Sequence, residues 1–250
     1  MLQRIKRTAE VTYDVASLGA RSVRNIGYAA RRHKLVFKHL YEAGNRSLFI
    51  VSIMGCFIGL VLALQSAFQL QKFSQENLIG LVGIAIVKEF GPVITAFLLA
   101  GRIGSAYAAE IGTMKVSEEI DALKVTGIRP VGYLAAPRLL ACVIMVPILT
   151  IYADFVAMLG GAFMAKVYAD VEFAVFFRVF FQYMDMTQVW RPLMKCVVFG
   201  IIISITGCYF GFNTTGGAEG VGKSTTDSVV CALLAVLVSD YFMERILLAF

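Results

Sequence analysis

Long apolar runs dominate the chain and are separated by short polar segments. Five runs are long enough to cross a hydrocarbon core of about 30 Å, for which a helix needs roughly 20 residues. They cover about residues 48–70, 78–109, 133–165, 193–212 and 226–250. Because unpaired backbone polar groups cannot face lipid, the runs are expected to be helices. The pattern predicts an all-α integral membrane protein with about five transmembrane helices in a single domain over residues 47–250.

Residues 1–46 precede the first run and carry ten Lys and Arg residues. They contain no continuous apolar stretch of the kind that marks a secretory signal peptide. We expect a basic amphipathic helix lying on the anionic cytoplasmic leaflet, and an organelle transit peptide is the alternative, against which Glu10 and Asp14 count. The apolar or small residues that form one helical face are Ile5, Ala9, Thr12, Val15, Leu18, Ser22, Ile26 and Ala29.

Composition agrees with a membrane protein. Hydrophobic residues make up 58% of the chain, charged residues 16%, and the mean hydropathy is +0.75. These values exclude a disordered chain, a collagen, a coiled coil and an ordinary soluble enzyme. The five cysteines lie in apolar runs without CxxC spacing, and both histidines, His33 and His39, lie in the basic segment. We therefore expect neither a disulfide framework nor a metal site.

The distribution of basic residues predicts the topology. With a cytoplasmic N-terminus, 15 of the 23 Lys and Arg residues fall on cytoplasmic segments and 5 on the opposite side. Cytoplasmic segments of membrane proteins carry such an excess. The expected orientation is N-terminus inside and C-terminus outside.

The second run is too long for one simple span, because 32 residues make a helix of about 48 Å. Pro92 lacks an N–H group and Gly91 precedes a proline, so a helix break is predicted here. Lys88 and Glu89 would each cost about 2.5–3.5 kcal/mol at mid-membrane. We expect a discontinuous helix lining a substrate cavity; the alternative places the charged pair at the outer headgroup level.

The end of the same run is rich in small residues at spacings of three and four. Gly101 and Ser105 begin this series, and Ala108, Ala109 and Gly112 continue it. Small residues at these spacings predict close packing against another helix or another copy of the chain. Arg102 and Glu110 approach the cytoplasmic end, where long side chains reach the interface.

A short amphipathic helix is predicted over residues 117–125. Ser117 is the expected N-cap, with Gly127 at the left-handed C-terminal position. Such a helix can dock in a groove of a soluble partner. The alternative, a helix lying on the membrane, is disfavoured by its acids. Its apolar stripe is Val116, Ile120 and Leu123, and the charged residues around it are Glu118, Glu119, Asp121 and Lys124.

Three further features carry weaker signals. Asp154 lies in the third run, where a carboxylate is a functional hypothesis by default, although the outer interface is the preferred location. Residues 171–181 form an aromatic segment too short to span. Residues 217–224 match the P-loop pattern GxxxxGK[ST]. A P-loop requires a soluble α/β domain, so we interpret them as a Gly-rich connection, with Ser224, Thr225 or Thr226 capping the fifth span.

Several motifs in one order resemble the MlaE (YrbE) family of ABC-transporter permeases. The resemblance extends from about residue 48 onward and is densest over residues 88–138. It rests on KEFGPVITA (88–96), AGRIGSA (100–106), AEIGTMKV (109–116), EIDAL (119–123), GIRP (127–130) and APR (136–138), with a weaker match at GVGKSTT (220–226).

The resemblance implies a five-span permease of the bacterial inner membrane that acts as a homodimer. It implies phospholipid movement between that membrane and the periplasmic or outer-membrane side. The implied partners are a cytoplasmic ATPase subunit, which would use ATP and Mg²⁺, and an MCE-domain lipid-binding protein. In the family the loop containing EIDAL is the coupling helix that docks on the ATPase, and the KEFGP segment lies beside the lipid cavity.

The site hypotheses follow. The chain shows no catalytic set, no cofactor of its own and no nucleic-acid partner. Alternatives are an ion-coupled secondary transporter, favoured by Asp154 and Glu89, and a membrane lipid enzyme, for which no residue set is visible. Substrate binding is assigned to Lys88, Glu89, Phe90, Gly91, Pro92 and the apolar Leu64; ATPase coupling to Ser117, Glu118, Glu119, Ile120, Asp121, Leu123 and Lys124; and helix packing to Gly101, Arg102, Ser105 and Glu110.

Overall fold

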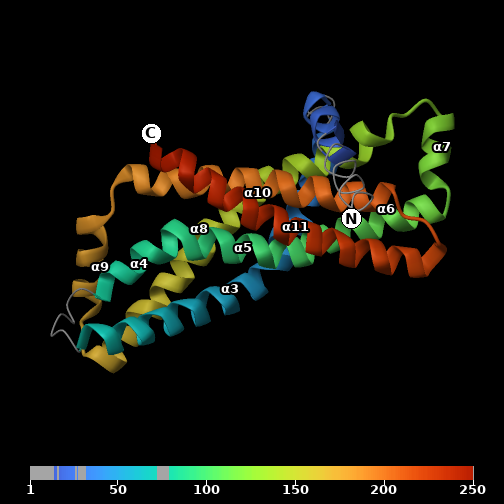
Figure 1. Cartoon of the computed structure of the whole chain (residues 1–250). Helices are drawn as coiled ribbons and strands as arrows, with labels where there is room; N and C mark the ends of the chain where they lie inside the picture. Colours follow the sequence, from blue (N-terminus) through green and yellow to red (C-terminus); the bar gives the residue numbers. More distant parts are fainter. Residues whose placement is uncertain (1–13, 16, 26, 28–31, 72–78, 250) are drawn as a thin grey trace, which may run out of the picture.

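The protein is a bundle of long helices that run side by side (Figure 1). The computed structural model describes residues 14–15, 17–25, 27, 32–71 and 79–249, and every element in them is helical. Figure 1 places α7 at one end of the bundle and α9 toward the other. The α-helices are α3 (His33–Gln71), α4 (Leu81–Ala85), α5 (Gly91–Leu99), α6 (Ser105–Val116), α7 (Glu119–Val125), α8 (Ala136–Ala169), α9 (Phe173–Tyr183), α10 (Met186–Phe212) and α11 (Gly217–Ala249); the π-helical turns are η2 (Ile86–Phe90), η3 (Ala100–Gly104) and η4 (Val131–Ala135).

Four helices of the described residues are long and apolar enough to cross a membrane, which confirms the all-α membrane fold. They are His33–Leu70, Leu81–Val116, Val131–Ala169 and Met186–Phe212. The fifth predicted span coincides with α11, whose 33 residues pack against α10 and α6. It is not one of the four. A membrane-spanning role for α11 therefore stays a prediction.

The helices extend beyond the apolar runs that marked them. α3 begins at His33, about 15 residues before its apolar run, and α10 begins at Met186. The hydropathy pattern predicts only the part of a helix that lipid can cover. The helical backbone hydrogen bonds continue into the neighbouring polar sequence, so each helix is longer than its apolar run. Most of the predicted N-terminal amphipathic helix lies outside the described residues. Within them, residues 17–24 are helical and Leu18 packs against a small hydrophobic cluster.

The helices α3 and α8 make the most extensive contact between two elements of the described residues, and they meet through small residues. A Cβ atom at Gly55 would lie 2.9 Å from the carbonyl oxygen of Ala153, and one at Gly160 would lie 2.7 Å from that of Cys56. At Gly59 it would overlap the carbonyl oxygen of Ala157. Glycine thus allows the two backbones to approach as closely as packed membrane helices do.

The predicted break at Gly91 and Pro92 is wrong. The chain stays helical through both residues, with Gly91 at φ −59° and ψ −57°. Instead η2 inserts one wide turn before them, and the Gly91 N–H donates to the carbonyl of Ile86, five residues earlier. A π-helical turn changes the pairing of the carbonyls around a proline and so avoids a break.

The short helix after α6 forms, but its start differs from the prediction. α7 begins at Glu119, and Ser117 does not cap it: the Ser117 hydroxyl donates to the carbonyl of Thr113 at 3.0 Å. Glu118 makes the turn by adopting a left-handed conformation, with φ 61°. The left-handed C-terminal residue is confirmed, because Gly127 has φ 76°.

The P-loop-like segment is also different from the expected connection. Residues 217–224 form the first two turns of α11, which starts directly after Gly216 at φ 90°. Ser224, Thr225 and Thr226 therefore lie inside the helix and do not cap it. A phosphate-binding loop wraps its backbone N–H groups around the ligand, whereas here they belong to helical sequence.

Candidate functional site

A buried lysine organises the charged residues near the α9 end of the bundle. Lys195 of α10 has a side chain that is only 1% exposed. Its Nζ atom lies 3.0 and 3.1 Å from the two carboxylate oxygens of Glu89 in η2. It also lies 3.1 Å from Asp240 and 2.7 Å from Glu244, which are four residues apart on α11. One ammonium group thus ties together three separate segments.

This charged cluster, formed by Lys195, Glu89, Asp240 and Glu244, borders a polar cavity of about 140 Å³. The three carboxylates outnumber the single ammonium group of Lys195. Arg191 supplies a further positive charge at the cavity wall. The residues lining the cavity are Lys88, Glu89, Thr187, Gln188, Arg191, Pro192, Lys195 and Glu244.

An apolar cavity of about 280 Å³ lies between α3 and the η2–α5 segment. Phe90 lines it and is 42% exposed. Consecutive residues of η2 thus face different environments: Lys88 and Glu89 line the polar cavity, and Phe90 lines the apolar one. The side chains around the apolar cavity are Met54, Phe57, Ile58, Val61, Leu62, Phe90 and Ile94.

The remaining residues assigned to substrate binding lie elsewhere. Gly91 and Pro92 are the first two residues of α5, and both are buried in the bundle. Leu64 is half-buried on α3 and lines neither cavity. Among the residues of known placement, no group of three or more His, Cys, Asp or Glu side chains is arranged to hold a metal ion.

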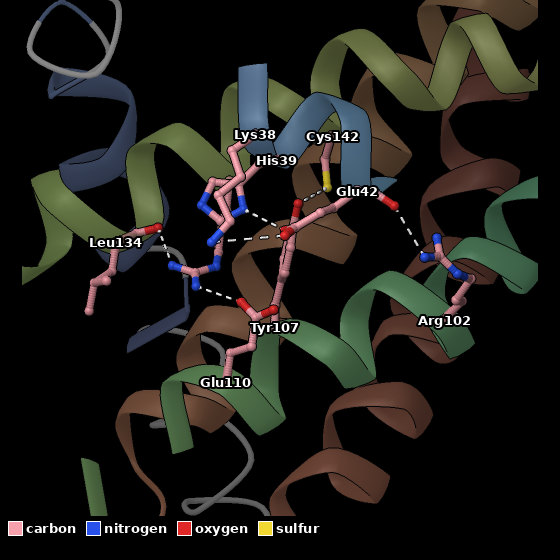
Figure 2. Close-up of polar contacts among 9 residues, drawn as sticks. Lys38, His39, Glu42, Arg102, Tyr107, Glu110, Leu134 and Cys142 are labelled. Atoms are coloured by element: carbon pink, nitrogen blue, oxygen red, sulfur yellow. Dashed lines mark hydrogen bonds and ion pairs between the residues drawn. The ribbon is translucent and has the colours of Figure 1, made fainter. Parts of the chain in front are cut away.

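The Arg102 side chain is hydrogen-bonded to α3, the first of the candidate membrane-spanning helices, instead of extending into solvent. Its guanidinium donates to the carbonyl of Glu42 at 3.1 Å (Figure 2). It also donates to the carbonyl of Ala43 at 3.3 Å and to the Ser47 hydroxyl. Ser105 is half-buried and its hydroxyl donates to the carbonyl of Gly101. A Cβ atom at Gly101 would meet nothing within 4 Å.

Glu110 takes part in a second polar network that joins α3, α6 and α8 (Figure 2). Arg138 is buried and donates to Glu110 at 2.7 Å and to the carbonyl of Leu134 at 2.9 Å. The rings of His39 and Tyr107 meet edge to face with their centroids 6.0 Å apart. These contacts fix the α7-proximal ends of three helices relative to one another.

α7 presents a mixed surface beyond these ends. Ile120 is buried and Leu123 packs against the same small cluster, so the protein covers these two residues of the predicted apolar stripe, whereas the third, Val116, is exposed. Asp121 binds Lys124 at 2.6 Å and Lys115 at 3.2 Å; these ammonium groups hold the pKa of its carboxyl below its usual value. The exposed side chains are Glu118, Glu119, Ala122, Lys124 and Val125, of which Val125 is 89% exposed.

Three members of the charged cluster did not emerge from the sequence. Lys195, Asp240 and Glu244 were not assigned a role, although each lies in an apolar run. The available signal was the rule that an intramembrane charge needs a partner. Applied to Glu89, it predicts a cation on another span, and Lys195 is one of the few candidates.

Known proteins resemble the chain over most of its length. The family model described as Permease MlaE matches residues 36–246. A probable ABC transporter permease protein of Synechocystis sp. is 39% identical over 219 residues, 87% of this chain and 82% of the relative. A probable ABC transporter permease protein of Rickettsia conorii is 36% identical over 245 residues, 96% of this chain and 95% of the relative.

A third relative comes from a plant. It is the chloroplastic protein TRIGALACTOSYLDIACYLGLYCEROL 1 of Arabidopsis thaliana, 34% identical over 208 residues, which are 83% of this chain and 59% of the relative. With the family model and the bacterial relatives in agreement over the helical bundle described above, the chain belongs to the MlaE family of ABC transporter permeases.

Proposed function

We propose that this permease moves phospholipids between the bacterial inner membrane and the periplasmic or outer-membrane side. The main supporting observation is that consecutive residues of η2 line two different cavities. Lys88 and Glu89 line a polar cavity, and Phe90 lines an apolar one. A phospholipid has the same division, with a charged headgroup and apolar chains. The name of the plant relative also refers to a glycerolipid.

In this proposal the two cavities have different tasks. The Lys88 and Arg191 side chains meet the anionic phosphate, while the charged cluster holds the wall of the polar cavity in place. Phe57 and Phe90 line the space for part of an acyl chain. No catalytic group is needed for this transfer, because no covalent bond changes.

An ABC transporter permease implies an ATPase partner, and we propose that α7 is its docking element. α7 lies at the end of the bundle opposite α9 (Figure 1). Ile120 packs in a hydrophobic cluster of the chain, and Asp121 pairs with Lys115 of α6. A displacement of α7 by the ATPase would therefore move α6. It would also move η3, whose Arg102 is hydrogen-bonded to α3. ATP and Mg²⁺ would be bound by the ATPase.

We further propose a homodimer with an MCE-domain protein as its lipid-binding partner. Large apolar side chains are exposed along α3 and α11, including Phe49 at 76%, Phe57 at 62% and Phe242 at 58%. Lipid covers part of this area, and a second copy would cover another part. The N-terminus and α7 are assigned to the cytoplasm and the end of α11 to the periplasm.

The alternative is an ion-coupled secondary transporter. The excess of carboxylates around Lys195 and the buried Asp154 favour it, because such transporters use intramembrane carboxylates. Dependence on ATP distinguishes the two functions. Lipid transfer by reconstituted permease with its ATPase should require ATP, and transfer that proceeds with an ion gradient alone would contradict the proposal.

The apolar cavity provides a direct test of substrate binding. Ile58→Trp adds an aromatic ring to a cavity of about 280 Å³ and should lower ATP-dependent phospholipid transfer at least tenfold, because the acyl chain loses its space. The measurement is transfer of phospholipid from proteoliposomes, with co-purified lipid counted by mass spectrometry. Ile53→Trp is the matched control, because Ile53 is exposed on α3 and lies outside the cavity. Equal transfer by both variants would refute this binding site.

Docking through α7 can be tested without disturbing its packing. Val125→Asp places a charge on a side chain that is 89% exposed and should weaken ATPase association at least tenfold. Glu119→Lys should act in the same direction, because it reverses an exposed charge. Co-purification of tagged permease with its ATPase measures the effect. Leu123→Asp should also abolish association, but it disturbs the internal cluster and is less specific.

The matched control is Val125→Ala, which removes apolar surface without adding charge. It should retain most of the association. If Val125→Asp and Glu119→Lys both bind the ATPase as well as the unmodified chain, α7 is not the docking element.

A further inference from the structure

A third cavity, of about 230 Å³, lies between η2, α8, α9 and α10. It shares only Pro192 with the polar cavity and no residue with the apolar cavity at Phe90. Apolar side chains make up nearly all of its wall. The residues that line it are Val87, Thr150, Ile151, Asp154, Phe155, Met158, Phe180, Met184, Val189, Pro192 and Leu193.

Asp154 is the exceptional residue in this wall. It is only 8% exposed, and its Oδ1 atom has no hydrogen-bond partner in the described part of the chain. The Thr150 hydroxyl, the other polar group, already donates to the carbonyl of Val146 at 2.9 Å. A Cβ atom at Gly91 would overlap this Oδ1 atom, so Oδ1 faces the start of α5, and Asp154 can meet a ligand in the cavity through its second carboxyl oxygen.

Burial decides the charge of this carboxyl. An isolated carboxylate among apolar side chains costs far more than a neutral carboxyl group, and the described residues place no ammonium or guanidinium group against it. Burial therefore favours the neutral form of the Asp154 carboxyl when the cavity holds no ligand. The neutral carboxyl offers one O–H donor, which suits an uncharged oxygen such as a hydroxyl or an ester carbonyl.

The size of the cavity restricts the ligand further. A dry cavity of roughly 150 Å³ already accepts benzene. A space of about 230 Å³ holds a stretch of one alkyl chain, but it is too small for a complete two-chain lipid.

We propose that this cavity is a second amphiphile-binding site, which takes one alkyl chain bearing an uncharged hydroxyl or ester group hydrogen-bonded to Asp154. The site is separate from the proposed phospholipid route, with which it shares only Pro192.

The experiment uses the purified full chain in detergent and a 16-carbon fatty alcohol with a diazirine on its chain. Photolabelling of the unmodified protein should fall on α8 and α10. Asp154→Leu should reduce this labelling about fivefold, the effect of losing one hydrogen bond. Asp154→Asn should keep it within about twofold, because the amide still donates. Met194→Leu, a volume-conserving change at an exposed side chain of α10 outside the cavity wall, is the control and should label normally.

Thermal stability without the probe separates binding from a structural role. Asp154→Leu should leave the melting temperature unchanged or raise it, because it removes an unpaired buried polar group. A lower melting temperature accompanying the lost labelling would mean that the carboxyl is structural, and undiminished labelling of Asp154→Leu would also overturn the proposal. The proposal would also be overturned if a quaternary ammonium probe of equal chain length labelled the protein better than the fatty alcohol and if Asp154→Asn abolished that labelling. No ATPase is present, so the result is independent of the proposed function.

Discussion

Replacing Lys195 by methionine should destabilise the protein by about 3 kcal/mol, because removing one partner of a buried ion pair leaves its counter-charges uncompensated. The Lys195 side chain is 1% exposed, and its ammonium group contacts Glu89, Asp240 and Glu244. Without it, three carboxylates from η2 and α11 repel one another. The effect would be measured as the loss of melting temperature and of ATP-dependent phospholipid transfer in the purified complex.

Lys166→Met is the matched control for this loss. Lys166 also pairs with an acid, Asp170 at 2.7 Å, but the two side chains are 43% and 91% exposed. Exposed pairs of this kind contribute about 0–1 kcal/mol. Neutralising two acids together with the lysine, in Lys195→Met/Glu89→Gln/Glu244→Gln, should recover part of the stability. If Lys195→Met melts at the same temperature as Lys166→Met, the charged cluster does not hold the helices together.

Gly59→Ala should be similarly damaging, although it adds a single methyl group. A Cβ atom at Gly59 would overlap the carbonyl oxygen of Ala157 and lie 2.9 Å from the backbone nitrogen of Gly161. Backbone atoms cannot turn aside as a side chain does, so α3 and α8 must separate along their closest contact. Overpacking of this severity costs about 3 kcal/mol. The measurement is the melting temperature of the detergent-solubilised protein.

Gly101→Ala makes the same chemical change where there is room for it. A Cβ atom there meets nothing within 4 Å, so this variant should melt at or slightly above the temperature of the unmodified protein. Comparing Gly59→Ala with Gly101→Ala separates the effect of a clash between two helices from the effect of the added methyl group on helix propensity. Equal melting temperatures for Gly59→Ala and Gly101→Ala would show that α3 and α8 do not pack as described.

The membrane fold could be predicted from the sequence because lipid imposes one requirement on every span. A run such as residues 48–70 must be apolar whatever it packs against, so hydropathy alone reveals it. The ends of the helices were harder. His33 and Met186 begin their helices in polar sequence, where lipid imposes no pattern.

The charged cluster could be predicted only in part. Glu89 was recognised because a charge in a span requires a partner, but the identity of that partner depends on how α10 and α11 align. No local pattern in the sequence specifies that alignment. The same limitation applies to α7: the sequence marks Ile120 and Leu123 as apolar, but it does not show that the chain's own residues cover them while Val116 of the same stripe stays exposed.

The wide turns η2 and η3 have a geometric consequence for the second span. Each inserts one extra residue, and one residue corresponds to about 100° of rotation around a helix axis. Side chains before Ile86 and after Gly104 are therefore out of phase by roughly 200° relative to an uninterrupted wheel. Deleting one residue from either turn would rotate α6 by about 100° around its axis. The face of α6 that carries the small residues would then no longer point toward α10, and α7 would move to a different side of the bundle.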